Sequence, residues 1–372
     1  MTTQSIKNNA TVLSKPLYDI SKCFQDNLEM PFPACPPIPL LEHFTQSTSM
    51  GRFLDYPLMT PIGVAACAIT TSRGITQLAQ LGFGVFTYKT IRSHAHPAHP
   101  MPNIVYLDAT HAALTSTEVG RFIKAQPSPP KATENINISN SLGNPCLDPE
   151  STQQDIAQAK QALNPGQVLI VSVYGESYAN RNLFADFAYT AQLAEEAGAD
   201  VIELNLSCPN LLDVSEPLYQ NAEAAYTVTH QVVHAVQRPV IAKIGWLQHS
   251  KQIAILLNAL ARAGASGISA INSINMQVVN TVGQPVFTPR AYSGVSGNLI
   301  RPLAIDFMTQ LADINQHDHL DLTLLGMGGV TQAQHFTEFH QAGSHIALSA
   351  TGVMWNPYLA LQYHNSRCEI NL

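Results

Sequence analysis

The sequence predicts an α/β protein: a (β/α)8 TIM barrel with an N-terminal lead-in segment and long loops at the active-site end. Three observations support this fold. Short apolar runs alternate with amphipathic runs from residue 61 onward. The apolar runs show no polar alternation, which is typical of strands buried on both faces of a parallel sheet. About eight such strand–helix units fit into roughly 310 residues, as in a barrel of this kind.

The eight predicted strands are the apolar runs at 61–66, 83–89, 168–173, 201–206, 239–245, 267–273, 322–328 and 345–351. Amphipathic runs at 184–199, 250–265 and 331–343 predict helices between them, the last with Thr331 as its cap. Each of these helices is expected to stop at a glycine, a common helix end. A doubly wound open sheet is the alternative arrangement of the same units.

Two kinds of segment fall outside this alternation. Residues 1–54 hold clustered prolines and little periodicity, which predicts a lead-in that wraps a main domain over 55–372. Longer connections at 90–148 and 274–296 are expected to be lids or binding loops.

Composition excludes several classes of protein. Of the 372 residues, 45% are hydrophobic and only 12% charged, so intrinsic disorder is excluded as the main state. A net charge of -7 argues against a nucleic-acid partner. No stretch approaches the ~18 apolar residues of a membrane span, and the first residues lack a signal-peptide core. Six cysteines without a CxxC pair argue against zinc ribbons, iron–sulfur clusters and a disulfide framework. We expect a cytoplasmic globular protein.

Polar residues interrupt the apolar runs where six of the eight strands end, and a barrel carries its active site at those ends. They are Lys89, Asn205, Ser207, Cys208, Asn210, Lys243, Asn272, Ser273, Gly328, Gly329, Ala350 and Thr351. A single such residue would indicate only a satisfied structural contact, but the repetition predicts a site.

The glycines predict a phosphate site. The run Gly326-Met327-Gly328-Gly329 follows the seventh strand, where barrels often bind phosphate through backbone N–H groups. Gly297, after the sixth unit, could add another N–H. The run is not GxGxxG, so a dinucleotide fingerprint is absent. A plain tight turn is the alternative.

These residues belong to a set of motifs that resembles the dihydroorotate dehydrogenase family across about residues 55–360. Glu203-Leu204-Asn205-Leu206-Ser207-Cys208-Pro209-Asn210 looks like that family's signature. The other similar segments, in family order, are 61–66, 82–84, 140–145 (NSLGNP), 270–274 (AINSI), 292–297 (YSGVSG) and 326–330 (GMGGV). The resemblance implies an FMN-dependent barrel enzyme that oxidises dihydroorotate to orotate in pyrimidine biosynthesis.

The resemblance also implies roles for individual residues. Those implied to bind substrate are Lys89, Asn140, Leu142, Gly143, Asn144, Asn205, Asn210, Asn272 and Ser273. Those implied to bind the cofactor FMN are Ala65, Ala66, Lys89, Thr90, Asn140, Asn205, Lys243, Ile271, Gly297, Gly328, Gly329, Ala350 and Thr351. Asparagines suit a pyrimidine because each amide offers a donor and an acceptor to a ring of alternating N–H and C=O.

Cys208 indicates the soluble class of the family, in which Cys replaces the Ser of the membrane-associated, quinone-using class. As general base, beside Lys89 as the other catalytic residue, it would remove the proton from carbon 5 while a hydride passes from carbon 6 to flavin N5. A thiol, with an ordinary pKa of about 8.5, suits this task. A small buried core cysteine is the alternative. Thr70, where the quinone class carries a flavin-contacting Lys, agrees with the soluble class.

Three features depart from the family pattern or compete with it. Cys67 stands where a glycine is expected against the flavin. The loop at 98–103 reads AHPMPN and lacks the expected Arg. His94, His96 and His99 have no carboxylate or cysteine close by in the sequence, so we expect loop histidines and no metal.

Other readings and partners remain open. The resemblance to the soluble class implies fumarate as the leading second electron acceptor, or NAD through an iron–sulfur partner subunit, and a homodimer. The alternatives are an FMN-dependent oxidoreductase acting on another pyrimidine, as in the dihydropyrimidine dehydrogenases, and an inactive flavin-binding homologue. An orotate-against-uracil binding comparison separates the first of these.

Overall fold

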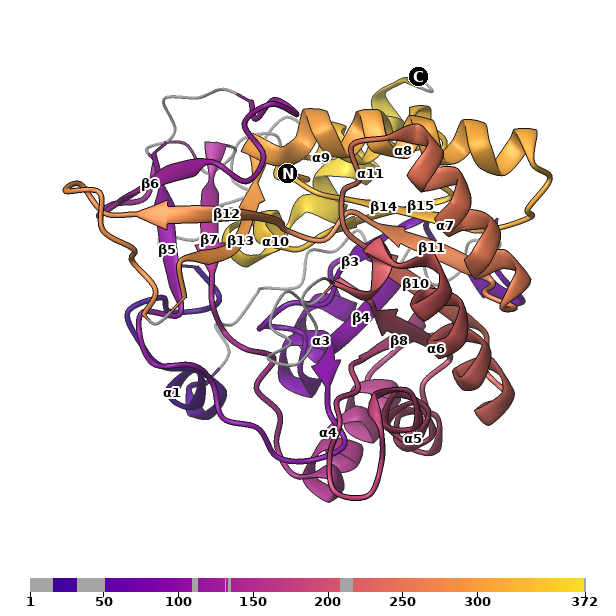
Figure 1. Cartoon of the computed structure of the whole chain (residues 1–372). Helices are drawn as coiled ribbons and strands as arrows, with labels where there is room; N and C mark the ends of the chain where they lie inside the picture. The colour runs from indigo at the N-terminus through magenta and orange to yellow at the C-terminus, as the bar shows by residue number, and fades with distance from the viewer. Residues whose placement is uncertain are drawn as a thin grey trace.

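The computed structural model describes residues 16–31, 51–108, 113–130, 132, 135–207, 217–288 and 290–370, without the side chains of 368–370. Its centre is a closed barrel of eight strands in the order β10-β11-β14-β15-β3-β4-β8-β9, each parallel to its neighbours (Figure 1). The strands are β3 (Ile62–Val64), β4 (Val85–Ile91), β8 (Val168–Val173), β9 (Val201–Asn205), β10 (Val240–Ile244), β11 (Gly267–Ala270), β14 (Thr323–Met327) and β15 (Ile346–Ser349). The predicted barrel is confirmed, and the open sheet is excluded.

Burial explains the predicted strands. Every residue of β4, β8, β9 and β10 is buried, because helices cover the outside of the barrel and side chains fill its inside. The helices are α3 (Ser72–Ala79), α4 (Pro149–Gln161), α5 (Leu183–Glu196), α6 (Ala222–Ala235), α7 (Ser250–Arg262), α8 (Arg301–His317), α9 (Ala333–Gln341), α10 (Thr351–Trp355) and α11 (Leu359–Ile370), with short 3-10 turns at Leu218–Gln220 and Asn298–Ile300.

The helix ends follow the predicted signals with one exception. Gly198, Gly264 and Gly343 follow α5, α7 and α9 with φ of 105°, 93° and 98°, a left-handed conformation that glycine adopts without strain. The cap predicted at Thr331 is wrong. Gln332 caps α9, and its backbone N–H donates to Nδ1 of His335 at 3.3 Å.

A hairpin closes the N-terminal end of the barrel. Strands β1 (Gly51–Phe53) and β2 (Tyr56–Leu58) pair antiparallel, and Phe53 and Leu58 are buried in the same apolar cluster as Val168 and Ile170 of β8. The hairpin crosses the boundary predicted at residue 54, and the division into lead-in and barrel stays a prediction.

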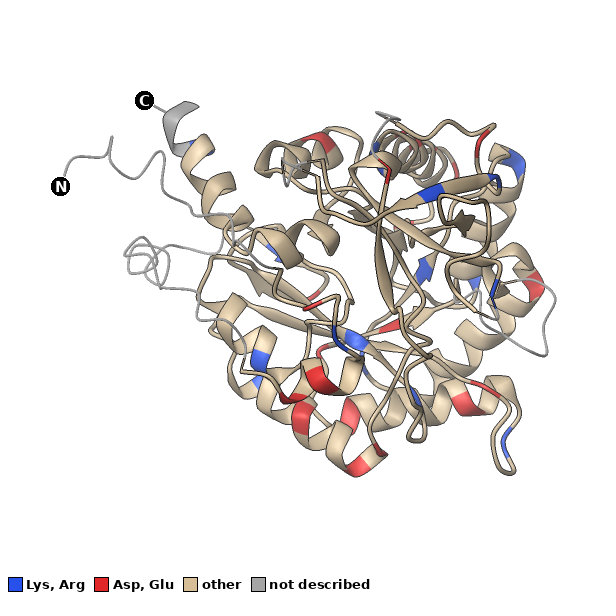
Figure 2. Cartoon of the chain, turned by 90° about the vertical axis from the view of Figure 1, so that its left-hand side faces the viewer, with Lys and Arg blue, Asp and Glu red and all other residues tan. Residues whose placement is uncertain are grey.

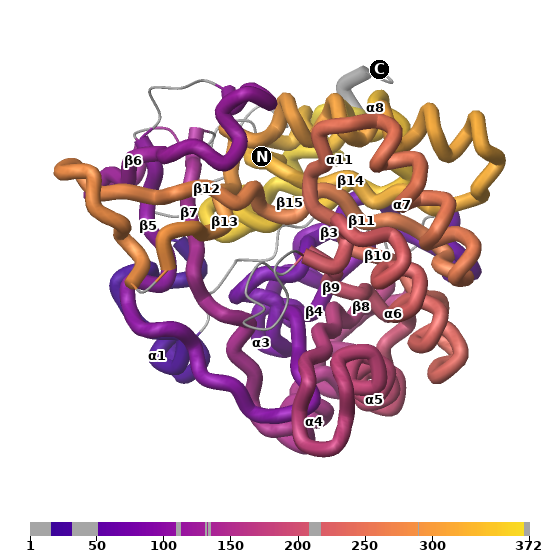
Figure 3. The backbone as a smooth tube through the Cα atoms, viewed as in Figure 1, coloured from indigo at the N-terminus to yellow at the C-terminus, as the bar shows by residue number. Residues whose placement is uncertain are grey.

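The two long connections are more ordered than the sequence predicts. They contain β5 (Ile104–Leu107), β6 (Phe122–Gln126), β7 (Asn137–Asn140), β12 (Ile274–Val279) and β13 (Tyr292–Gly297). These strands form a second closed sheet in the order β12-β13-β7-β5-β6. It stands to one side of the main barrel, on the left in Figures 1 and 3. The sheet brings β7 and β13 to the site described below.

The described part of the lead-in packs on the barrel. Helix α1 (Phe24–Glu29) buries Phe24, and the Leu17 N–H donates to the Met354 carbonyl at 2.7 Å. Figure 2 shows acidic and basic residues interspersed on the surrounding helices and loops. In the described part of the chain, no helix combines the length and apolarity that crossing a membrane requires.

Candidate active site

One cavity opens where the barrel strands end, between the barrel and the second sheet. All the described residues that the sequence predicted for substrate or cofactor line it, except Gly297. They are Ala65, Ala66, Lys89, Thr90, Asn140, Leu142, Gly143, Asn144, Asn205, Lys243, Ile271, Asn272, Ser273, Gly328, Gly329, Ala350 and Thr351. Gly297 lies behind the wall, with its carbonyl oxygen facing Gly329. Cys208 and Asn210 lie outside the described residues, so their predicted roles stay predictions.

The asparagines form a hydrogen-bonded network on one wall. The Asn272 amide donates to Ser207 Oγ at 2.6 Å and to Asn205 Oδ1 at 3.3 Å. The Asn205 amide in turn donates to Thr90 Oγ1 at 3.2 Å, and Thr90 Oγ1 lies 3.0 Å from Ser172 Oγ. These bonds hold each amide in a set orientation, as selective recognition of a polar ring requires.

Lys89 is a buried cation in the cavity wall. It lies two residues before the end of β4, and its ammonium donates to the Pro145 carbonyl at 2.6 Å and to the Thr90 carbonyl at 3.2 Å. Phe24 of α1 lies 5.7 Å from it, measured to the ring centroid. Burial lowers the pKa of Lys89, because desolvation disfavours the charged form. An anionic ligand would compensate that desolvation.

A second buried cation is held by a carboxylate. The Lys243 ammonium lies 3.8 Å from Oε1 of Glu203, whose side chain is fully buried. The other oxygen, Oε2, accepts a hydrogen bond from Ser269 at 2.8 Å. Lys243 thus lies beside a buried carboxylate at the cavity wall, where its ammonium can face a group that gains negative charge.

The backbone at Gly328 and Gly329 fits a phosphate. Their φ angles are 124° and 81°, and a Cβ on Gly329 would lie 2.6 Å from the Cβ of Arg301 and 2.8 Å from the Gly297 carbonyl oxygen. Glycine is therefore required here. Among the described residues, the N–H groups of Gly328 and Gly329 have no hydrogen-bond acceptor, and both residues line the cavity. Unpaired N–H groups at a cavity wall suit an anion.

A buried arginine holds the loop that covers the cavity. Nε and Nη2 of Arg92 donate to the carbonyls of Asn144 and Gly143, both at 3.1 Å. Its Nη1 lies 2.7 Å from Oε2 of Glu176, in the loop after β8. His99 packs on the same loop: a Cβ on Gly143 would lie 2.3 Å from its Nε2. The position of this loop thus depends on residues from the two loops that follow β4 and β8.

Cys67, which stands where the family pattern has a glycine, lies in a tight turn at the cavity wall. Its backbone carbonyl accepts from the Thr70 hydroxyl at 2.8 Å and from the Thr70 N–H at 3.1 Å, which closes a tight turn after β3. The residue lines the cavity, and burial raises the pKa of its thiol to about 11. The thiol is therefore protonated and neutral at physiological pH.

Comparisons with known proteins identify the family. A family model described as dihydroorotate dehydrogenase matches residues 115–363. A dihydroorotate dehydrogenase of Dictyostelium discoideum is 34% identical over 369 residues, which cover 95% of this chain and 98% of that protein. The chain belongs to the dihydroorotate dehydrogenase family.

Two further relatives show the range of similarity. The catalytic subunit of dihydroorotate dehydrogenase B (NAD(+)) of Methanocaldococcus jannaschii is 26% identical over 289 residues, 77% of this chain and 81% of that one. The PreA subunit of NAD-dependent dihydropyrimidine dehydrogenase of Escherichia coli K12 is 30% identical over 202 residues, 52% of this chain and 46% of that protein. Membership of the dihydroorotate dehydrogenase family confirms the predicted barrel and the predicted flavin-dependent oxidoreductase.

The sequence missed four residues that shape the site of this dihydroorotate dehydrogenase family member. Phe24 carries no local signal, because it reaches the cavity from the lead-in. Arg92, three residues after Lys89 on the same buried segment, was detectable as a second buried cation. Ser172 lies one residue before the end of β8, and Glu176 follows that strand, which is not among the six strands predicted to end in site residues.

Proposed function

We propose that this protein oxidises dihydroorotate to orotate, with FMN as its resident cofactor. The observation that carries the proposal is the single cavity that joins an amide network, two buried cations and an unpaired glycine backbone. Family membership supports it independently. FMN would accept the hydride that leaves carbon 6 of the substrate.

The residues divide the work of binding. Asn205 and Asn272 would orient the pyrimidine ring, because their amides are already fixed by hydrogen bonds. Lys89 would neutralise the substrate carboxylate. Gly328 and Gly329 would donate N–H groups to the FMN phosphate, and Lys243 would balance charge on the flavin ring. Asn140, Leu142, Gly143, Asn144 and Ser273 would close around the ring, with Asn210 from the neighbouring loop.

Cys208 would remove the proton from carbon 5. Loss of that proton and of the hydride from carbon 6 leaves the carbon 5–carbon 6 double bond of orotate, so the atoms balance. Cys208 follows Ser207, which the structure places within 2.6 Å of the Asn272 amide nitrogen. The place of Cys208 directly after Ser207 in the sequence supports a base beside the amide network.

Resemblance to the soluble class extends the proposal beyond the cavity. Fumarate would be the second electron acceptor, the protein would work in the cytoplasm, and two copies would form a homodimer. These three points rest on the class that Cys208 and Thr70 indicate.

Anaerobic addition of dihydroorotate to the purified, flavin-loaded protein tests the reaction. Loss of the yellow flavin absorbance after dihydroorotate is added supports the proposal. Extraction of the cofactor should release FMN rather than FAD. An unchanged spectrum would overturn the proposed activity and favour an inactive flavin-binding homologue.

A second candidate is oxidation or reduction of a pyrimidine without a carboxylate. The similarity to the dihydropyrimidine dehydrogenase subunit favours it. Lys89 separates the two, because a buried cation needs the anion that orotate brings and uracil lacks. Tighter binding of orotate than uracil to wild type, with the preference lost in Lys89→Met, supports the first candidate.

A further inference from the structure

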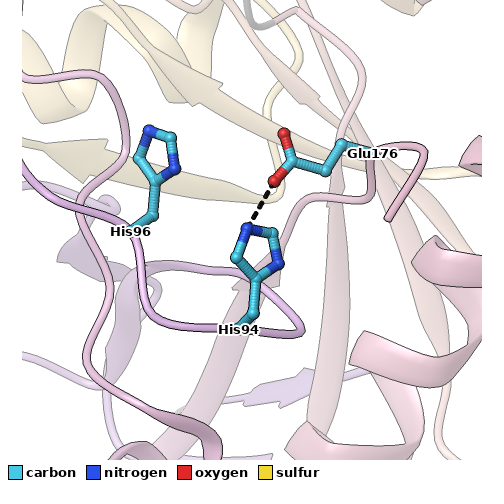
Figure 4. Close-up of side chains that lie close together, drawn as sticks. All are labelled: His94, His96 and Glu176. Atoms are coloured by element: carbon cyan, nitrogen blue, oxygen red, sulfur yellow. Dashed lines mark ion pairs between the residues drawn. The ribbon is translucent and has the colours of Figure 1, made fainter. Parts of the chain in front are cut away.

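A cluster of metal-ligating side chains lies outside the cavity, between the loops that follow β4 and β8. His94 and His96 come from the first loop and Glu176 from the second, and one ligand atom from each lies within 4.8 Å of the others (Figure 4). The sequence predicted loop histidines because no carboxylate is near them along the chain. The fold supplies that carboxylate from a segment 80 residues away. We propose that His94, His96 and Glu176 bind a divalent transition-metal ion, with Zn²⁺ as the best match.

The hydrogen-bond partners of His94 allow its Nε2 to bind a metal ion. Its Nε2 lies 2.8 Å from Oε1 of Glu176, and its Nδ1 lies 3.3 Å from Oγ of Ser93. The single hydroxyl proton of Ser93 is directed to Oδ2 of Asp186, at 3.0 Å. In the tautomer in which Ser93 accepts from Nδ1–H, the Nε2 lone pair faces Oε1 of Glu176, and a metal ion can lie between these two ligand atoms.

The contacts behind His94 suit a ligating histidine. Its Nδ1 faces the hydroxyl of Ser93, which in turn donates to Asp186. A hydrogen-bonded partner behind the ring is the type of outer contact that orients a ligating histidine.

The surroundings hold the ligands in place. The His94 ring stacks on Tyr178 with centroids 3.7 Å apart and an angle of 7° between the planes. The second carboxylate oxygen of Glu176, Oε2, pairs with Arg92, so the carboxylate would bind the metal through Oε1 alone. Asp186 pairs with Arg181 and accepts the hydrogen bond of Ser93 beside His94.

The geometry matches a four-coordinate ion after small side-chain rotations. Ligand atoms about 2.0–2.1 Å from a tetrahedral Zn²⁺ lie about 3.3–3.4 Å from one another. His94 Nε2 and Glu176 Oε1 must separate slightly from 2.8 Å, and the His96 ring must turn inward. The side chains of His94 and Glu176 are 16% and 28% exposed, so water can take the fourth position and the ion can enter.

The ligand set selects the class of ion. Two imidazoles and one carboxylate favour Zn²⁺ and similar transition metals over Mg²⁺ or Ca²⁺, which prefer all-oxygen sites. The metal site would take no part in the reaction, since none of its three ligands lines the cavity. Its effect would be to tie the loop after β4 to the loop after β8.

Isothermal titration of the chelator-treated, flavin-containing protein with ZnCl₂ tests the proposal. Wild type should bind one equivalent that His96→Ala and Glu176→Gln lose or weaken by at least 10–100-fold. His96→Ala is the sharper variant, because it leaves the Glu176–Arg92 ion pair in place. MgCl₂ should give no comparable binding.

A matched control comes from another histidine pair. His230 and His234 on α6 have ring centroids 4.1 Å apart but no third ligand beside them in the described part of the chain. His230→Ala should keep the full Zn²⁺ equivalent. Hydrogen exchange with Zn²⁺ should slow in residues 92–99 and 174–178 of wild type and not of His96→Ala. Equal Zn²⁺ titrations for wild type and His96→Ala, or no binding by wild type, would overturn the site.

Discussion

Arg92 should be the residue whose loss most disturbs the loop over the cavity. Arg92→Met removes the guanidinium but keeps an apolar stem that can still pack on Tyr174, whose ring centroid lies 4.8 Å from the guanidinium carbon. The change strips the carbonyls of Gly143 and Asn144 of their buried donor, since Arg92 is only 4% exposed.

The size of the effect follows from those contacts. Two hydrogen bonds from a charged donor contribute about 1.5–3 kcal/mol each. The Glu176 ion pair adds little, because that carboxylate is partly exposed and keeps His94 as a partner. We expect a loss of about 3–6 kcal/mol, measured either as lower global stability or as local opening of residues 141–146. Local opening that is easier by about 3 kcal/mol corresponds to roughly 100-fold faster exchange.

Two measurements separate these outcomes. Urea unfolding reports the global loss, and native-state hydrogen exchange reports the opening of the loop. Arg52→Met is the control, because Arg52 is exposed and also donates to one carbonyl, that of Asp55 at 2.7 Å; it should change stability by less than about 0.5 kcal/mol. The reasoning fails if Arg92→Met lowers the unfolding free energy by less than about 1 kcal/mol and leaves exchange in the loop unchanged.

Two further outcomes are expected. Cys208→Ser should slow anaerobic flavin reduction by roughly 10²–10⁴-fold and leave orotate affinity nearly unchanged; reduction at wild-type speed would remove the proposed base. Gly329→Ala should purify with little flavin, because its Cβ would meet neighbouring backbone and its φ is 81°; full flavin content by absorbance would contradict the phosphate site.

The sequence by itself determined the barrel, because each strand is buried on both faces and so appears as a short, unbroken apolar run. The helix ends at Gly198, Gly264 and Gly343 were also predictable from local sequence, because glycine adopts the left-handed conformation that ends a helix. The cavity residues at the ends of barrel strands, such as Lys89 and Lys243, were predictable because parallel strands bring their carboxyl ends together. The cavity residues at 140–144 were predicted only from the resemblance to the family.

Only the tertiary structure decided the second sheet and the contacts between loops. Strands β7 and β13 pair although more than 150 residues separate them along the chain. Both strands are short, and the sequence around them shows no clear hydrophobic periodicity. Arg92 and Glu176 meet from separate loops, and Phe24 reaches Lys89 from the lead-in. Periodicity describes how one segment meets solvent and core, whereas these contacts depend on how distant segments are placed by the closed barrel. For that reason, a carboxylate beside His94 became visible only in the fold.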